Sequence, residues 1–161
     1  AEMPAGGVGV MAKAARKATK KAAVRERQQI AALPYVIVSG RALVCLATSR
    51  ETRRWIIPKG WPIEGVEPHN LAALEAMEEA GLLGKVGDKP IGSYHYDKKR
   101  GDGSIVHCEV DTFALEVEQQ MPTWPEQEER NTKWFAPEEA ASQVQEPELR
   151  DLIRKFAKKA L

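Results

Sequence analysis

Three glutamates near the middle of the chain have the type and spacing that divalent-metal chemistry needs. Glu75, Glu78 and Glu79 stand at positions i, i+3 and i+4, so in a helix their carboxylates share one face. Carboxylates at these spacings repel one another, and two of them would lie at the negative end of the helix dipole. A hard cation such as Mg²⁺ would offset this repulsion, because clustered carboxylate oxygens suit it. The alternative is an ordinary solvated acidic face.

The segment around these glutamates predicts a strand end, a tight loop and then a short helix. Its sequence, over residues 58–82, is PKGWPIEGVEPHNLAALEAMEEAGL. We expect the helix to begin near Pro68 and to stop at Gly81, because glycine is favoured just past a helix end. The apolar residues of the other helix side can pack on a core, and they are Ala73, Ala76, Met77 and Ala80.

This segment resembles the Nudix box, G-x5-E-x7-R-E-U-x-E-E-x-G-U, in which U is a bulky apolar residue. The matching positions are Gly60, Glu75, Glu78, Glu79, Gly81 and Leu82. Two charged positions depart from the pattern, since its first glutamate falls on Val66 and its arginine on Leu74. In the family this arginine orients the glutamates through a salt bridge. We therefore expect Leu74 to reduce activity or metal affinity and to leave the fold intact.

The resemblance implies hydrolysis of a diphosphate linkage with divalent metal ions, Mg²⁺ first and Mn²⁺ as the alternative. Glu78 and Glu79 would then bind the metals, and Glu75 would be a ligand or the general base. The backbone carbonyl next to the first box glycine is a family metal ligand, which here points to Lys59 or Gly60. In the family a further carboxylate often comes from a late loop, and the candidates on that loop or on a predicted strand are Glu109, Asp111, Glu126, Glu128 and Glu129.

Basic residues near the box favour a substrate with several phosphates, because each arginine can fork onto phosphate oxygens. Arg50, Arg54 and Lys59 lie on the loop and strand that enter the box, and we expect them to bind substrate. Ordinary loop solvation is the alternative for each of them. Trp61 either stacks on an adenine or lines the pocket, or it anchors the loop.

Segments outside the box narrow the resemblance. The diphosphoinositol-polyphosphate phosphohydrolase-like branch of the family is similar to four segments of this chain: RERQQIAALPY, TSRETRRWIIPKGWP, YDKKRGDGS and WFAPEEA. This resemblance covers most of residues 25–157. This similarity implies cleavage of diphosphoinositol polyphosphates, dinucleoside polyphosphates or inorganic polyphosphate. The PKG run followed by an aromatic residue is also similar to the PKGH of diadenosine tetraphosphate hydrolases.

Length and composition indicate one domain in this chain of 161 residues, with a flexible basic N-terminal extension over residues 1–24. The resemblance implies that residues 25–161 form a Nudix hydrolase domain. No apolar run approaches the roughly 20 residues that span a bilayer, and no signal-peptide pattern opens the chain. Cys45 and Cys108 lie in strand-like runs, which indicates buried thiols rather than a zinc site or a disulfide framework. We expect a cytoplasmic setting and no membrane partner.

The order of predicted elements indicates an α/β/α sandwich with a mixed sheet, which is also the fold that the Nudix resemblance implies. Apolar runs on either side of Ser39-Gly40 predict a hairpin over residues 33–49. The further strands are expected at residues 55–57, 90–96, 104–117 and 132–135. Besides the box helix, helices are expected at residues 11–31, 137–142 and 147–161, the last with Leu149, Leu152, Ile153 and Phe156 on its apolar face.

Charge is unevenly spread along the chain. Residues 1–31 carry seven Lys or Arg against two Glu, a net charge of +5, which leaves −4 for the remainder of a chain whose total is +1. A solubilising helix or a frayed terminus explains this basic arm, and contact with RNA or another polyanion is the alternative.

Three functions follow from these observations. The leading one is a metal-dependent pyrophosphohydrolase of a polyphosphorylated small molecule. The second is a catalytically weak Nudix-like module that binds a nucleotide or an inositol phosphate, which Leu74 and Val66 favour. The third is an RNA-end hydrolase or RNA binder that uses the basic arm, and we do not favour nucleic acid as the partner.

Overall fold

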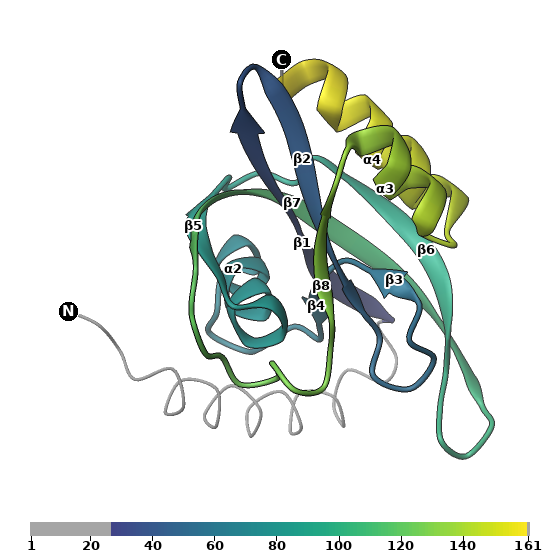
Figure 1. Ribbon diagram of the computed structural model, residues 1–161. Helices are drawn as coiled ribbons and strands as arrows, with labels where there is room; N and C mark the ends of the chain where they lie inside the picture. The colour runs from purple at the N-terminus through teal and green to yellow at the C-terminus, as the bar shows by residue number, and fades with distance from the viewer. Residues whose placement is uncertain (1–26, 161) are drawn as a thin grey trace.

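Two long parallel strands form the centre of the sheet in the computed structural model, which describes residues 27–160 (Figure 1). Strand β1 (Gln28–Val38) runs beside β7 (Ile105–Gln120) over eight register pairs, from Gln28 opposite Glu109 to Tyr35 opposite Glu116. Every other strand pair in the described part of the chain is antiparallel. The sheet is therefore mixed, as the sequence predicts.

Six shorter strands complete the eight-stranded sheet. Pairing with β1 are β2 (Arg41–Thr48) and β4 (Lys59–Gly60); pairing with β2 are β3 (Trp55–Ile56) and β8 (Thr132–Phe135); pairing with β7 are β5 (Leu82–Val86) and β6 (Gly92–Lys99). The β1–β2 hairpin turns at Ser39-Gly40, where both residues have positive φ (51° and 74°). This is the geometry of a two-residue type I′ turn, which confirms the predicted hairpin.

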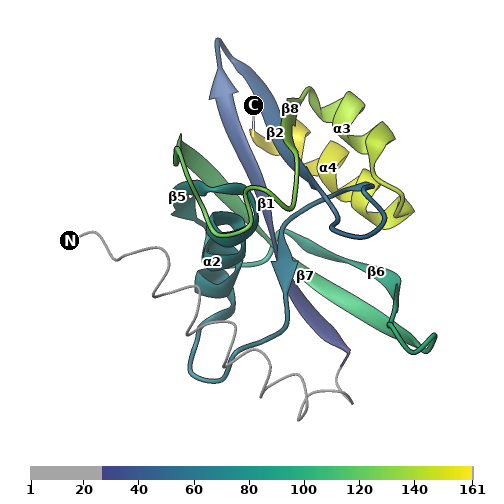
Figure 2. The same ribbon diagram turned by 60° about the horizontal axis from the view of Figure 1, so that its bottom comes forward.

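The two faces of the sheet are covered by different helices (Figures 1 and 2). Helix α2 (Pro68–Ala80) packs on one face, and α3 (Pro137–Gln143) and α4 (Pro147–Ala160) pack on the other. Alternate residues of β1 therefore enter different cores: Ile30 and Ala32 pack with α2, and Ala31 and Leu33 pack with the other pair of helices. The expected α/β/α sandwich is confirmed.

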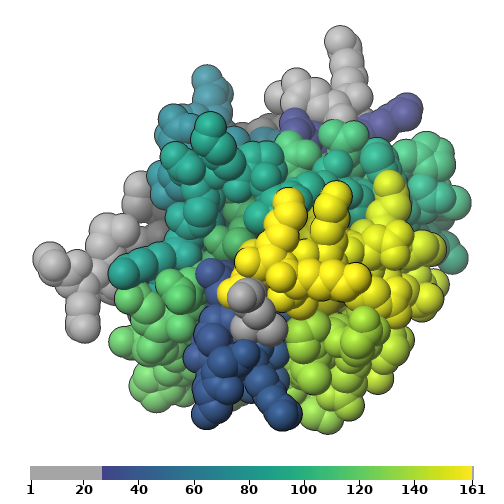
Figure 3. All heavy atoms as spheres, turned by 90° about the horizontal axis from the view of Figure 1, so that it is seen from above, coloured from purple at the N-terminus to yellow at the C-terminus, as the bar shows by residue number. Residues whose placement is uncertain are grey.

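Helix α4 buries one side and exposes the other. Leu149, Leu152 and Ile153 are buried as predicted, and the Phe156 ring meets the Tyr35 ring edge to face, with centroids 4.8 Å apart. Figure 3 shows α4 and α3 side by side as one continuous outer surface. No helix in the described residues is long and apolar enough to cross a membrane.

Several predicted boundaries differ from the structure. The helix expected over residues 11–31 is wrong at its end, because residues 28–31 belong to β1, where pairing with β7 outweighs local helix preference. Its residues 11–26, and the extension predicted over residues 1–24, lie outside the described part. Strands β4 and β5 were not predicted, since β4 has two residues and β5 follows Gly81 directly, without a turn signal.

The His95 side chain, between Glu148 and Glu109, joins the edge strand β6 to its neighbours. The His95 amide donates to Glu148 Oε1 on α4 (2.9 Å), and its ring lies 3.0 Å from the same oxygen and 3.1 Å from Glu109 Oε2 on β7. Hydrogen bonds to Glu148 and Glu109 raise the pKa of His95 above its ordinary value of 6.5. The imidazole therefore links β6, α4 and β7.

We expect Glu148→Gln to lower the pKa of His95 toward that ordinary value, which titration of the ring proton signals by NMR would measure. A raised folded pKa stabilises the protein below the unfolded pKa of about 6.5, and this stabilisation disappears as the pH rises through the folded pKa. The wild type should thus exceed Glu148→Gln in unfolding free energy more at about pH 5.5 than at about pH 8.5. An unchanged His95 pKa in the variant would contradict the proposed link.

Candidate functional site

The three box glutamates are buried rather than solvated. Glu75 and Glu78 have no exposed surface, and Glu79 is 4 % exposed. Helix α2 has the predicted limits, beginning at Pro68 and ending before Gly81, whose φ of 70° is that of a left-handed C-cap. The alternative of a solvated acidic face is therefore wrong. Burying adjacent carboxylates is unfavourable unless positive charge balances them. The site therefore requires positive charge close to these carboxylates.

Gly60 allows the Glu75 carboxylate to lie directly against strand β4. Gly60 is opposite Ile30 of β1, in the centre of the fold. A Cβ atom at this position would lie 2.5 Å from both Cδ and Oε2 of Glu75, closer than unbonded atoms approach. The glycine is thus required by a side chain fifteen residues further along the chain, and it brings the β4 backbone beside the box carboxylates.

Of the five late carboxylates, the structure brings Glu126 to the box helix. Glu126, on the loop between β7 and β8, is 3 % exposed, and its amide donates to the backbone oxygen of Glu78 (3.0 Å). The other four are not brought to the box helix in this way: Asp111 accepts from Gln28 (2.7 Å), Glu109 lies beside His95, Glu129 lies beside Arg50, and Glu128 is exposed.

Arg130 is not among the residues predicted from the sequence, and it is the cation closest to this cluster among the ion pairs of residues 27–160. Its Nη2 and Nε atoms lie 2.9 and 3.0 Å from Glu126 Oε1, and its Nη1 lies 3.6 Å from Glu79 Oε1. Burial raises the pKa of the Glu79 carboxyl, and the Arg130 guanidinium acts against this rise. The available signal was the position of Arg130 four residues after Glu126, in a run of acidic residues.

The predicted substrate-binding residues do not all lie together. Lys59 is half-buried, with its Nζ atom 5.2 Å from the centre of the Tyr96 ring. Desolvation lowers the pKa of Lys59 to about 8, although the Glu79 charge opposes this. Arg54 pairs with Glu146 (Nη1–Oε2, 2.8 Å). Arg50 is exposed instead and pairs with Glu129 at 3.4 Å.

Trp61 follows β4 directly and is only 7 % exposed. Burial to this degree favours the loop-anchor interpretation of this residue over a ring that is open for stacking. Lys59 and Gly60 precede it in β4 and point to opposite faces of the sheet. The short strand thus serves the carboxylate cluster on one face and the cation near Tyr96 on the other.

The donor set of this site fits a hard divalent cation. Glu75, Glu78, Glu79 and Glu126 supply oxygen ligands of the kind that Mg²⁺ prefers, and both side-chain oxygens of Glu75 and one of Glu78 are sealed from solvent. When ionised, these four carboxylates carry more negative charge than Arg130 and Lys59 balance. No group of three His, Cys, Asp or Glu within residues 27–160 forms a ready-made metal cage, so the fit is one of donor type and charge.

Comparisons with known proteins bear on the family. The model of the NUDIX domain family matches residues 27–156. The chain is 32 % identical over 125 residues to Nudix hydrolase 16, mitochondrial, of Arabidopsis thaliana. The aligned region covers 74 % of this chain and 69 % of that protein. The chain is 30 % identical over 105 residues to diphosphoinositol polyphosphate phosphohydrolase 3-alpha of Mus musculus, covering 64 % and 60 %. The chain spans about half to two thirds of the length of the curated relatives that it matches.

Solved structures share the architecture. A C. elegans Ap4A hydrolase in a binary complex superposes with a TM-score of 0.62 at 20 % identity, covering 83 % of this chain and 96 % of that chain. The E. coli dihydroneopterin triphosphate pyrophosphohydrolase gives 0.61 at 18 % identity, with the same coverage. At these identities the likeness establishes the fold.

The end of α2 generates a stability prediction. Alanine at Gly81 must adopt φ near +70° and would place its Cβ 2.3 Å from Trp124 Cε3. Gly40 also has positive φ, but a Cβ there meets nothing within 4 Å. We expect Gly40→Ala to lower the unfolding free energy by about 1–2 kcal/mol through backbone strain alone.

Gly81→Ala should lower the unfolding free energy further, because the Trp124 ring and its loop must also move. Urea titration of both variants would measure the difference. Equal losses of unfolding free energy in the two variants would show that the packing of Trp124 does not require a residue without Cβ at position 81.

Proposed function

Since the chain belongs to the Nudix hydrolase family, we propose that it is a divalent-metal-dependent pyrophosphohydrolase that cleaves a phosphoanhydride bond in a polyphosphorylated small molecule. The buried carboxylate cluster of Glu75, Glu78 and Glu79 carries this proposal. A chain that used this helix only for packing would gain nothing from three charges without solvent. In this proposal the carboxylates of the cluster hold a divalent cation beside a phosphate-bearing substrate.

The residues around the cluster have separate tasks in this proposal. Glu78, Glu79 and the backbone at Lys59 or Gly60 would hold Mg²⁺ or Mn²⁺. The metal, when bound, supplies charge neutralisation at phosphate oxygens and acidifies a bound water. Glu75 lies against β4 in the space that Gly60 leaves, and in this proposal it would accept a proton as general base. Glu126 is the second candidate for that role, because its loop is bonded to Glu78.

The substrate class follows from the neighbouring cations. Lys59 is half-buried over the Tyr96 ring, where its charge interacts with that of Glu79. Arg54 is held by Glu146, so both residues present positive charge at fixed positions. A substrate with several phosphates supplies acceptors for both cations at once. Diphosphoinositol polyphosphates and dinucleoside polyphosphates are the two classes that we propose, in keeping with what the Mus musculus and C. elegans proteins above are named for.

A catalytically weak binding module remains the second candidate function. Leu74 and Val66 stand where the family pattern has charged residues, and both pack as partly buried apolar side chains against the core under α2. Neither can orient a carboxylate. An RNA-directed function would depend chiefly on the basic arm, most of which lies outside the described residues.

Phosphate release with Mg²⁺ from a small panel would test the leading function. The panel comprises a diphosphoinositol phosphate, diadenosine tetraphosphate, a nucleoside triphosphate and a capped RNA. We expect turnover of one of the first two classes, and a loss of at least about a hundredfold in Glu78→Gln, which keeps the side-chain shape and removes the charge. Absent turnover together with thermal stabilisation by one ligand would favour the binding module instead.

Lys59→Met should weaken the use of multiply phosphorylated substrates. Losing a hydrogen bond between a charged donor and a phosphate group costs about 1.5–3 kcal/mol, so kcat/KM should fall about ten- to hundredfold. The matched control is Lys85→Met, which removes an exposed lysine of β5. Steady-state kinetics of both variants would measure the effect, and similar small losses in both would remove Lys59 from the proposed substrate site.

A further inference from the structure

Arg130 is the most enclosed of the arginines that form side-chain ion pairs in the described residues. Its side chain is 8 % exposed, against 31 % for Arg54, 41 % for Arg154 and 55 % for Arg50. Exposed pairs are screened by water and contribute little, whereas a guanidinium without water interacts strongly with what it touches. The contacts of Arg130 therefore have consequences for the carboxylates that they reach.

Those contacts join parts of the chain that are distant in sequence. Glu126 belongs to the same loop as Arg130, whereas Glu79 belongs to α2. A third contact runs to the end of β2, where Arg130 Nη1 donates to the backbone oxygen of Thr48 (3.2 Å). One planar guanidinium thus fixes the loop carboxylate and the helix carboxylate relative to the sheet.

The loop itself is held at the next residue. The Asn131 amide donates to Thr48 Oγ1 (2.9 Å), and the Thr48 amide donates to the Asn131 carbonyl (2.9 Å). Both bonds anchor the backbone immediately beside Arg130. The guanidinium therefore starts from a fixed backbone position, which is what orienting another side chain requires.

Leu74 explains why the carboxylates need a positioning group from elsewhere. It occupies the box position at which the family pattern has the arginine, and its side chain packs against the apolar cluster under α2. It is one helical turn from Glu78 and has no polar atom to offer. The α2 face therefore lacks the orienting cation that the pattern would supply.

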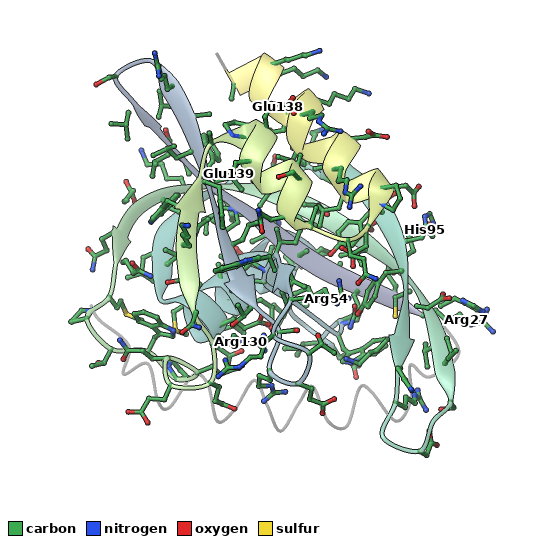
Figure 4. All side chains as sticks on the ribbon, turned by 45° about the vertical axis from the view of Figure 1, so that its right-hand side comes forward. Arg27, Arg54, His95, Arg130, Glu138 and Glu139 are labelled. Carbon is green, nitrogen blue, oxygen red and sulfur yellow. The ribbon has the colours of Figure 1, made fainter. Side chains whose placement is uncertain are left out.

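We propose that Arg130 is a positioning residue that holds Glu79 and Glu126 for the hydrolysis, and that it performs from the β7–β8 loop the task that Leu74 cannot perform from the helix. This inference rests on the proposed function, because it assigns Arg130 to the carboxylates that the metal would use. Figure 4 shows Arg130 near the lower end of the sheet, well away from the Glu138 that Arg154 contacts.

The test compares Arg130→Met, Arg130→Lys and the control Arg154→Met, which removes an ion pair on the opposite helical layer. Mn²⁺ binding without substrate is measured by electron paramagnetic resonance, and kcat and KM are measured on the panel substrate that the wild type cleaves. Loss of an outer-shell partner lowers metal affinity or activity about ten- to hundredfold. We expect this loss in Arg130→Met for Mn²⁺ affinity and kcat, with KM within about twofold of the wild type.

Arg130→Lys should show a smaller loss, because it keeps the charge and loses the fork that reaches three acceptors. Arg154→Met should match the wild type. Wild-type Mn²⁺ affinity and kcat in Arg130→Met would overturn the inference while leaving the proposed function standing. A wild type that neither binds Mn²⁺ nor cleaves any panel substrate would overturn both. If Arg130→Met does not fold, Arg130→Lys decides, and a folded Arg130→Lys with full Mn²⁺ affinity and kcat would overturn the inference.

Discussion

The burial of several carboxylates at one place is the constraint on which the rest of this structure depends. Glu75, Glu78 and Glu79 are buried away from water on one face of α2, and Glu126 is brought beside the helix by a loop. Charges without water need opposite charges or strong dipoles close by. Arg130 balances part of the negative charge through its contacts with Glu79 and Glu126. The negative charge that Arg130 leaves unbalanced favours a divalent cation at this place.

The end of α2 shows how the fold satisfies that constraint while it pairs backbone oxygens of the helix end. Gln120 Nε2 donates to the Ala80 oxygen (2.9 Å), the Met121 amide to the Gly81 oxygen (2.8 Å), and the Glu126 amide to the Glu78 oxygen (3.0 Å). The β7–β8 loop thus closes over the last turn of the helix. The same backbone contacts that complete the helix end also deliver Glu126 and Arg130 to the carboxylates.

Strand β4 connects this acidic side with the basic side of the site. Gly60 faces α2 and leaves room for Glu75, while Lys59 faces Tyr96 on the other side of the sheet. Their opposite orientation is a consequence of the two-residue period of a strand. A strand of two residues is enough because β1, which it pairs with, is buried from both sides.

Much of the fold and half of the candidate site could be predicted from the sequence, because these features are local. The limits of α2 follow from a proline and a glycine, the β1–β2 hairpin from Ser39-Gly40, and the shared face of the three glutamates from helical periodicity. The Nudix resemblance was carried by the same contiguous segment, and the family match confirms it.

What only the tertiary structure decided depends on residues that are distant in sequence. The sequence left five late carboxylates open, and backbone pairing between the β7–β8 loop and α2 selected Glu126. The i, i+4 spacing of Glu126 and Arg130 is visible in the sequence, but the partners of Arg130 on α2 and at the end of β2 are not. The sequence also left the acidic face open to solvent as an alternative. Periodicity places side chains on a face of a helix, but what covers that face is determined by elements folded from elsewhere in the chain.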